Sequence, residues 1–339
     1  MIAIVKEKAG PGFVIKEVDV PKYKANEVLI KVECIGICGS DIPIFNGIRN
    51  VPIPFIAGHE FTGVIVEVGS EVKKYKKGDR VVPSSVQNCF TCSYCREGYE
   101  VLCDELVETG IHVNGSFAEY VVVPENSVHK LPDNVSFLEG SMVDPIASAH
   151  RPVKKASVTP EDTVVVFGPG PIGLLSLQVA KLEGANKVIM VGTRENRLNL
   201  AKELGADITV NIGEKGEDAV EKIKEYTNGK MADIIIEATG KASVVETCIN
   251  SLKKKGHLSL AGIFHEPCTI PVTTIVRNEL TIEGSICYSY NDFEHCIDLL
   301  SSRRIDVKKM ITHELPLKDI KKALELIDKR EAIKVVLYP

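Results

Sequence analysis

The spacing of apolar residues divides the chain into two regions. Up to about residue 150, short segments rich in β-branched residues are separated by Gly and Pro, at 27–34, 61–68, 79–83 and 117–124. Short strands broken by turn residues are typical of irregular β structure. The pattern predicts a barrel-like β domain in this first region.

From about residue 162, apolar runs of strand length alternate with segments of helical periodicity. Strands are predicted at 163–167, 187–191, 208–211, 233–238, 257–261 and 280–284. Helices are predicted between them at 174–184, 196–204, 218–226 and 243–253. Strands that are apolar along their whole length and joined by helices form parallel sheets covered on both faces. The second region is therefore predicted to be a doubly wound parallel sheet.

After about residue 287 this alternation ends. Two amphipathic helices, at 293–301 and 317–328, and a closing strand at 333–338 remain. So few elements cannot bury a core of their own, and we expect them to pack on the first domain. The expected organisation is a first domain of residues 1–149, a second of 150–287, and a return of 288–339 to the first.

Composition and charge exclude several classes of protein. Of the 339 residues, 44% are hydrophobic and 26% are charged, which is close to the globular average and argues against disorder. The net charge of -5 is dispersed and offers no basic field to nucleic acid. No apolar run approaches the roughly 18 residues of a membrane span, and the N-terminus does not read as a secretory signal. We expect a cytoplasmic protein that binds neither nucleic acid nor membranes.

Ten cysteines are many for a chain in a reducing compartment, where thiols bind metals more often than they pair. Four lie within one short, polar segment, namely Cys89, Cys92, Cys95 and Cys103. Four thiolates at about 2.3 Å satisfy a tetrahedral Zn²⁺ and leave no position for a substrate. An iron–sulfur cluster or four small core residues are the alternatives. The spacing favours a structural zinc site.

A second metal site is indicated by residues scattered along the chain. Cys38 lies in a Cys-Gly-Ser-Asp segment, His59 and Glu60 in Gly-His-Glu, and Asp144 before a proline. Taken singly, a cysteine such as Cys38 is more often a core residue, and a histidine such as His59 is more often a hydrogen-bonded loop residue. Together, a Cys/His/carboxylate set with an open position is how catalytic zinc is held. Zinc lowers the pKa of bound water from about 15.7 to about 7, and the same effect prepares an alcohol to lose hydride.

A glycine-rich turn follows the strand at 163–167 and begins the next helix. It reads Gly168-Pro169-Gly170-Pro171-Ile172-Gly173. In this context Gly168 permits the tight turn, Gly170 lets a pyrophosphate approach the backbone and Gly173 allows close packing of helix and strand. The helix N-terminus, with Pro171 and Ile172, supplies a positive dipole. Ordinary turn glycines are the alternative to this dinucleotide site.

The end of the second strand of this region bears on the choice of cofactor. An acid usually stands there and binds the adenosine ribose, whereas this chain has Thr193 and Arg194. A guanidinium suits the 2′-phosphate of NADP, so NADP is favoured over NAD. The alternative is that Arg194 is a solvated surface charge and Glu195 binds the ribose.

Taken together these motifs resemble the zinc-dependent medium-chain dehydrogenase family over nearly the whole chain, and its sorbitol-dehydrogenase-like branch of polyol dehydrogenases above all. The resemblance is carried by the four-cysteine loop and by Gly58-His59-Glu60, Lys77-Gly78-Asp79-Arg80-Val81, Leu131-Pro132-Asp133 and Leu204-Gly205-Ala206-Asp207. It implies a GroES-like β-barrel catalytic domain with a Rossmann domain, assembled as a homodimer or homotetramer. It also implies reversible hydride transfer between a secondary alcohol of a polyol and a nicotinamide cofactor.

The same resemblance implies roles for individual residues. Catalytic zinc would be held by Cys38, His59, Glu60 and a water, with Asp144 as a second candidate carboxylate. Ser40 matches the hydroxyl residue that relays the substrate proton toward solvent.

Three departures from the branch leave the substrate open. Asp144 precedes Pro145 where a Glu is common, Pro43 stands where many polyol dehydrogenases have His, and Cys287 replaces the Arg of the sorbitol pocket. With Pro43, the segment Cys-Gly-Ser-Asp-Ile-Pro resembles that of galactitol-phosphate dehydrogenases. A polyol-phosphate dehydrogenase and a threonine-type dehydrogenase are therefore alternatives.

A phosphate substrate would need an additional cationic pocket, for which Arg49 and Lys155 are candidates. A non-enzymatic relative that keeps the fold is a further alternative. The cysteines without a role, Cys34, Cys248, Cys268 and Cys296, are expected to be buried thiols.

Overall fold

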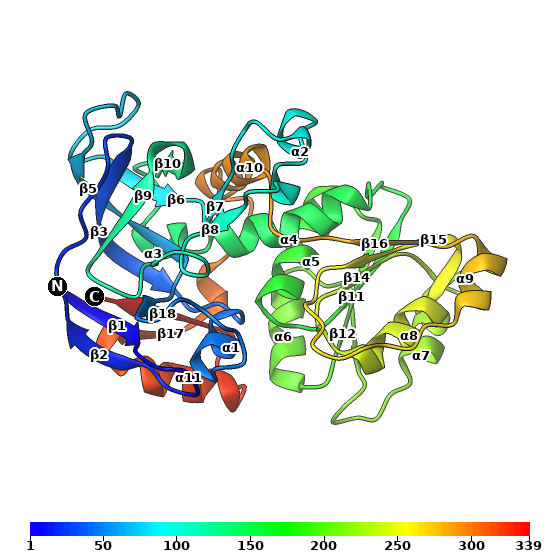
Figure 1. The fold of residues 1–339 in the computed structure, drawn as a ribbon. Coiled ribbons are helices and arrows are strands. Elements are labelled where there is room, and N and C mark those ends of the chain that lie inside the picture. The colour runs from blue at the N-terminus through cyan, green and yellow to red at the C-terminus, as the bar shows by residue number, and fades with distance from the viewer. The chain divides into compact units, whose positions relative to one another are not determined.

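The structure, a computed structural model, describes all 339 residues and divides into two compact units (Figure 1). The first unit joins Met1–Asp144 with Ser289–Pro339, and the second is Pro145–Tyr288. The division falls inside α4 (Val143–Lys155), after residue 144 rather than after residue 149. None of the helices is long and apolar enough to span a bilayer.

The first unit is built on one large sheet with the strand order β10-β6-β5-β3-β18-β17, and β9 also pairs with β3. Its strands are β3 (Glu27–Gly36), β5 (Glu60–Val68), β6 (Arg80–Pro83), β9 (Tyr120–Pro124), β10 (Val128–Lys130), β17 (Ile311–Pro316) and β18 (Lys334–Tyr338). The chain's last strand joins this sheet because β18 pairs antiparallel with the end of β3. Apolar side chains of β3, β5, β9, β18 and the helix α11 (Ile320–Asp328) then share one buried core.

Smaller sheets and short helices complete the first unit. The sheets have the orders β2-β1-β4 and β7-β8 and comprise β1 (Ile2–Lys6), β2 (Val14–Glu17), β4 (Phe55–Ile56), β7 (Val86–Gln87) and β8 (Val107–Glu108). The α-helices are α1 (Asp41–Phe45), α2 (Ser93–Arg96), α3 (Phe137–Gly140), α10 (Tyr290–Ser301) and α11 (Ile320–Asp328). Four 3₁₀ turns are η1 (Glu100–Leu102), η2 (Glu125–Ser127), η3 (Lys308–Met310) and η4 (Leu317–Asp319).

The second unit confirms the predicted doubly wound sheet. Its strands pair in parallel in the order β13-β12-β11-β14-β15-β16, with α5 and α6 on one face and α7, α8 and α9 on the other (Figure 1). The strands are β11 (Thr163–Phe167), β12 (Lys187–Gly192), β13 (Ile208–Asn211), β14 (Ala232–Glu237), β15 (Leu252–Leu260) and β16 (Thr281–Gly284). The helices are α5 (Pro171–Leu182), α6 (Glu195–Glu203), α7 (Ala219–Tyr226), α8 (Ala242–Asn250) and α9 (Val272–Asn278). The strand order reverses beside β11, where this fold binds ligands.

Two sequence expectations were wrong in detail. The helix predicted at 243–253 ends at Asn250, and Lys253 already belongs to β15. The Lys253 side chain forms an ion pair with Asp233 of the neighbouring strand β14, which stabilises it within β15. The strand is irregular just beyond it, where Lys255 has a φ of 63°. Cys268, expected to be buried, is exposed.

Candidate active site and metal centres

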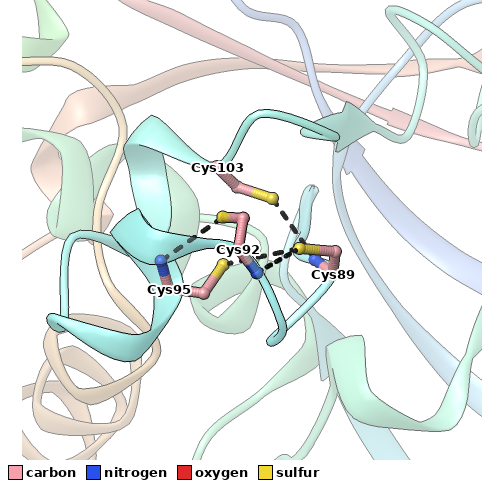
Figure 2. Close-up of side chains that lie close together, drawn as sticks. All are labelled: Cys89, Cys92, Cys95 and Cys103. Carbon is pink, nitrogen blue, oxygen red and sulfur yellow. Dashed lines mark hydrogen bonds between the residues drawn. The ribbon is translucent and has the colours of Figure 1, made fainter.

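The four clustered cysteines come together on one lobe of the first unit. Cys89 and Cys92 precede α2, Cys95 lies within it, and Cys103 follows η1. Their sulfur atoms lie within 4.8 Å of one another and face a common centre (Figure 2). Cys89 Sγ and Cys95 Sγ are 4.0 Å apart. This is close to the sulfur–sulfur distance of about 3.8 Å in a tetrahedral site with bonds of about 2.3 Å. The arrangement fits a four-thiolate zinc site.

Backbone amides donate hydrogen bonds to these sulfurs and favour the thiolate form of Cys89. Cys89 Sγ accepts N–H bonds from Thr91 at 3.4 Å and Cys92 at 3.3 Å, and Cys103 Sγ accepts from Cys89 at 3.3 Å. Hydrogen bonding by Thr91 and the backbone N–H groups lowers the pKa of the Cys89 thiol to about 6. Such donors favour the charged form that binds metal.

Strand pairing in the first unit brings together a second cluster of possible metal ligands. Gly36 at the end of β3 lies opposite Glu60 at the start of β5. Cys38 follows Gly36 by two residues and His59 precedes Glu60, so all three side chains arrive at the same place. The Cys38 sulfur, a His59 ring nitrogen and a Glu60 oxygen lie within 4.8 Å of one another. His59 and Glu60 are buried, and Cys38 is half-buried.

Asp41 lies beneath this cluster and is completely buried. Its Oδ2 accepts the Cys38 N–H at 2.9 Å, and its Oδ1 is 3.6 Å from His59 Nδ1. Burial disfavours a charged His59, but the negative charges of Asp41 and Cys38 outweigh burial and raise the pKa of His59 well above its ordinary value. The cluster therefore concentrates negative charge and suits a bound cation.

Glu60 has a cationic partner that no motif indicates. Lys334 at the start of β18 donates to Glu60 Oε2, and each residue is only 2% exposed. The lack of a side chain at Gly36 makes room for this pair, because a Cβ there would lie 2.4 Å from Glu60 Oε2 and 2.9 Å from Lys334 Cε. A buried carboxylate needs such compensation.

The remaining predicted residues of this site are nearby. Ser40 Oγ is 3.5 Å from His59 Nε2, on the ring edge away from Asp41. Asp144 begins α4, is 8% exposed, and its Oδ2 accepts the Ser85 hydroxyl at 2.9 Å. Asp144 is not one of the three residues that group for a metal.

The glycine-rich turn of the second unit has the shape that its sequence predicts. Gly168 follows β11 with a φ of 102°, and Gly170 precedes α5, whose first residue is Pro171. A Cβ on Gly173 would lie 1.9 Å from Gly168 O, whereas a Cβ on Gly170 would meet no atom within 4 Å. Gly173 is thus required for packing, and Gly170, followed by Pro171 and Ile172, leaves open space at the helix N-terminus for a phosphate.

Beyond β12, Thr193 and Arg194 lead into α6, which begins at Glu195. The Glu195 carboxylate, the alternative ribose ligand, accepts from Asn211 Nδ2 at 2.8 Å and from Lys215 Nζ at 3.3 Å. Both oxygens of the Glu195 carboxylate therefore already accept hydrogen bonds from residues of the second unit.

Comparison with known proteins identifies the family. Residues 24–133 match the alcohol dehydrogenase GroES-like domain, and residues 171–302 match the zinc-binding dehydrogenase domain. The sorbitol dehydrogenase of Halalkalibacterium halodurans is 37% identical, over 100% of this chain and 99% of the relative. The chain belongs to the zinc-dependent medium-chain dehydrogenase family, in its sorbitol-dehydrogenase-like branch.

Two further relatives of this dehydrogenase bear on substrate and cofactor. The D-arabitol-phosphate dehydrogenase of Enterococcus avium is 36% identical, over 97% of this chain and 96% of the relative. A putative zinc-binding dehydrogenase from Sinorhizobium meliloti, solved bound to NADP, superposes with a TM-score of 0.93 at 30% identity and covers 100% of this chain and 99% of its own. The dehydrogenase is thus an oxidoreductase with a nicotinamide cofactor, and the non-enzymatic alternative is rejected.

The sequence assigned no role to two residues of this dehydrogenase's site. Asp41 lies in the Cys-Gly-Ser-Asp segment, so its proximity to Cys38 was available from the sequence. Lys334 is 274 residues from Glu60 in the chain, and no local signal connects them.

Proposed function

We propose that this dehydrogenase reversibly oxidises a secondary alcohol of a polyol, using one catalytic zinc ion and, by preference, NADP(H). The convergence of Cys38, His59 and Glu60 within 4.8 Å carries the proposal. When bound, zinc supplies a Lewis acid that makes a hydroxyl group more acidic. The similarity to sorbitol and arabitol-phosphate dehydrogenases supports a polyol as the alcohol.

The chain's own residues orient the metal ligands and move the proton. Asp41 holds the Cys38 backbone and faces His59 Nδ1, which orients both ligands. Ser40, half-buried beside His59 Nε2, accepts the substrate's hydroxyl proton and passes it toward solvent. Replacing Ser40 by Ala should lower turnover and shift its pH profile, while Ser40→Thr, which keeps the hydroxyl, should retain both.

Glu60 rather than Asp144 completes the set of protein ligands in this proposal. Both carboxylates have a partner in the protein, Lys334 for Glu60 and Ser85 for Asp144, but only Glu60 lies within 4.8 Å of the Cys38 and His59 ligand atoms. The zinc content per chain distinguishes Glu60 from Asp144 as the carboxylate ligand. Glu60→Gln should weaken retention of the catalytic zinc, and Asp144→Asn should not. The reverse result would assign the role to Asp144.

A second zinc on Cys89, Cys92, Cys95 and Cys103 is proposed as structural, because four protein thiolates close its coordination. An iron–sulfur cluster on the same residues would show visible absorption and bound iron in the purified protein. Metal analysis of the purified chain therefore decides between the two.

The preference for NADP(H) rests on Arg194 after β12 and on the engagement of Glu195 by Asn211 and Lys215. A guanidinium stabilises a 2′-phosphate. Replacing Arg194 by Ala should lower kcat/KM with NADP and leave kcat/KM with NAD nearly unchanged. A wild-type enzyme with the higher kcat/KM for NAD would reject this preference.

A polyol phosphate is the second candidate substrate, favoured by the arabitol-phosphate relative and by Pro43. Of the two proposed phosphate ligands, Lys155 is engaged by Glu283 and by the Gly284 carbonyl, each at 2.7 Å, which leaves Arg49. Polyols, their phosphates, threonine and simple secondary alcohols, each assayed with NAD and with NADP, distinguish the candidates. Activity confined to threonine would assign the threonine-type alternative.

We also propose a homodimer or homotetramer. Strand β16 is the edge of its sheet and pairs only with β15. Val272 and Val276 of α9, which packs on β15, are 58% and 69% exposed, and Ile286, two residues after β16, is 50% exposed. Unpaired edges and exposed apolar side chains favour association. A monomeric mass by light scattering would reject this assembly.

A cytoplasmic location is proposed from the thiols. None of the ten cysteines forms a disulfide bond, and the sulfur atoms of Cys89, Cys92, Cys95 and Cys103 lie within 4.8 Å of one another, as metal ligands would. Such sites persist where thiols stay reduced. Cell fractionation of the tagged chain tests the location.

A further inference from the structure

Glu195 is the only acidic residue in the segment 192–197, which joins β12 to α6. Both of its carboxylate oxygens are engaged: Oε2 accepts from Asn211 at 2.8 Å and Oε1 from Lys215 at 3.3 Å. These two hydrogen bonds, that from Asn211 above all, lower the pKa of Glu195. The carboxylate is thus ionised at neutral pH and held in place.

Asn211 is itself held in one orientation. It ends β13 and is 2% exposed, and its Oδ1 accepts the N–H groups of Gly213 at 3.2 Å and Glu214 at 3.0 Å. With the amide oxygen committed to two donors, the amide nitrogen must face the carboxylate. The orientation needed to hold Glu195 is therefore built into the backbone after β13.

The segment after β13 also packs directly on the segment after β12. A Cβ on Gly213 would lie 2.5 Å from the Thr193 carbonyl oxygen. Thr193, Arg194 and Glu195 are consequently supported by the loop that contains Asn211 and Lys215. A change in that loop therefore acts on the proposed adenosine end of the cofactor site.

In this fold, an acid after the second strand binds the ribose hydroxyls of NAD and repels a 2′-phosphate. We propose that Asn211 and Lys215 determine cofactor specificity by withholding the Glu195 carboxylate from the ribose, so that this carboxylate does not repel a 2′-phosphate beside Arg194. The inference rests on the proposed preference for NADP(H). Asn211 and Lys215 act through Glu195 and are positioning residues.

The test releases Glu195 by the double substitution Asn211→Ala and Lys215→Gln. The ratio of kcat/KM for NADP to that for NAD should fall by about tenfold, the order expected of one nearby charge in a partly solvated site. By calorimetry, affinity for adenosine 2′,5′-bisphosphate should fall relative to 5′-AMP, which needs no turnover. The matched control adds Glu195→Gln, and both ratios should return toward wild type because a neutral amide does not repel phosphate.

Lys215 is exposed enough for Lys215→Gln alone to leave folding intact, since its side chain is 58% exposed. That variant should shift both ratios in the same direction by a smaller factor, whether or not the double variant folds. Equal shifts with and without Glu195→Gln would overturn the inference. A wild type that favours NAD, combined with a shift that Glu195→Gln reverses, would reject the NADP(H) preference and leave this inference standing.

Discussion

Lys334 and Glu60 form an ion pair in the interior of the first unit, where each is 2% exposed. They come from β18 and from the start of β5, and both strands flank β3. The return of the C-terminal segment therefore delivers a cation to the carboxylate of the proposed zinc site. Breaking a buried pair leaves an uncompensated charge, which costs more than the pair itself contributes.

Replacing Lys334 by Met should destabilise the first unit by about 3–5 kcal/mol, because the Glu60 carboxylate would stay buried without its partner. The midpoint of urea unfolding and the affinity for zinc, measured by chelator competition, report the effect. Lys334→Arg preserves the charge and should restore both in large part. Unchanged stability and zinc affinity in Lys334→Met would contradict a role for the pair.

Replacing Cys38 by Ser should remove one zinc ion and nearly all turnover. Zinc content, measured by mass spectrometry of metals, should fall from about two ions per chain to about one, as expected for a site of three protein ligands that loses its thiolate. The fold should persist because Cys38 is only half-buried. Retention of both zinc ions with full activity would disprove the assignment.

Replacing Cys103 by Ser should lower the stability of the protein more than its turnover. The four-thiolate site would lose its metal while Cys38, His59 and Glu60 stay intact. A loss of about 2 kcal/mol would lower the thermal midpoint by roughly 4–8 °C, with turnover at low temperature largely kept. If stability is unchanged while activity disappears, this loop is not structural.

Two glycines of the turn should respond differently to alanine. Gly173→Ala places a Cβ 1.9 Å from Gly168 O and should destabilise the second unit. Gly170→Ala meets no protein atom within 4 Å and should fold normally. It should nevertheless weaken binding of a dinucleotide, whose pyrophosphate approaches that backbone. Calorimetric titration with NADP alongside thermal unfolding distinguishes the two effects.

Glu139 makes the first unit sensitive to acid. It is 4% exposed, forms the capping box of α3 with Ser136, and pairs with Arg303. Burial opposes its ionisation, but hydrogen bonds from Ser136 and then Arg303 prevail and lower its pKa. A lowered folded-state pKa means that this stabilisation is complete above the unfolded value of about 4.3 and is lost as the pH falls through the folded one.

Glu139→Gln should therefore cost about 0.5–2 kcal/mol at neutral pH, the range of a lost helix cap, and less at low pH. Urea unfolding at pH 7 and below pH 4 measures the difference. An equal cost at both pH values would assign the effect to packing rather than to charge.

The local pattern of apolar and polar residues predicted much of this protein's architecture. The apolar runs of the second unit matched its strands closely because strands buried on both faces leave no ambiguity of register or face. The first unit was harder: β17 has alternating half-buried positions, and β1 and β2 went unpredicted. Short strands of that kind are defined by their partners rather than by their own residues.

The proposed sites divide along the same line. Cys89, Cys92, Cys95 and Cys103 and the turn from Gly168 to Gly173 are local, so their spacing in the sequence was enough to name them. Lys334 and the capture of Glu195 by Asn211 were not, because they depend on strand order and on which oxygen faces which donor.

By itself the sequence determined the two kinds of fold, the proposed ligand types and the glycine turn, since each follows from residues close together in the chain. Only the tertiary structure decided which carboxylate joins Cys38 and His59, which cation balances it, and why Glu195 is occupied. Those outcomes require side chains to be brought together across strands, and no periodicity encodes the charge that a distant strand will deliver.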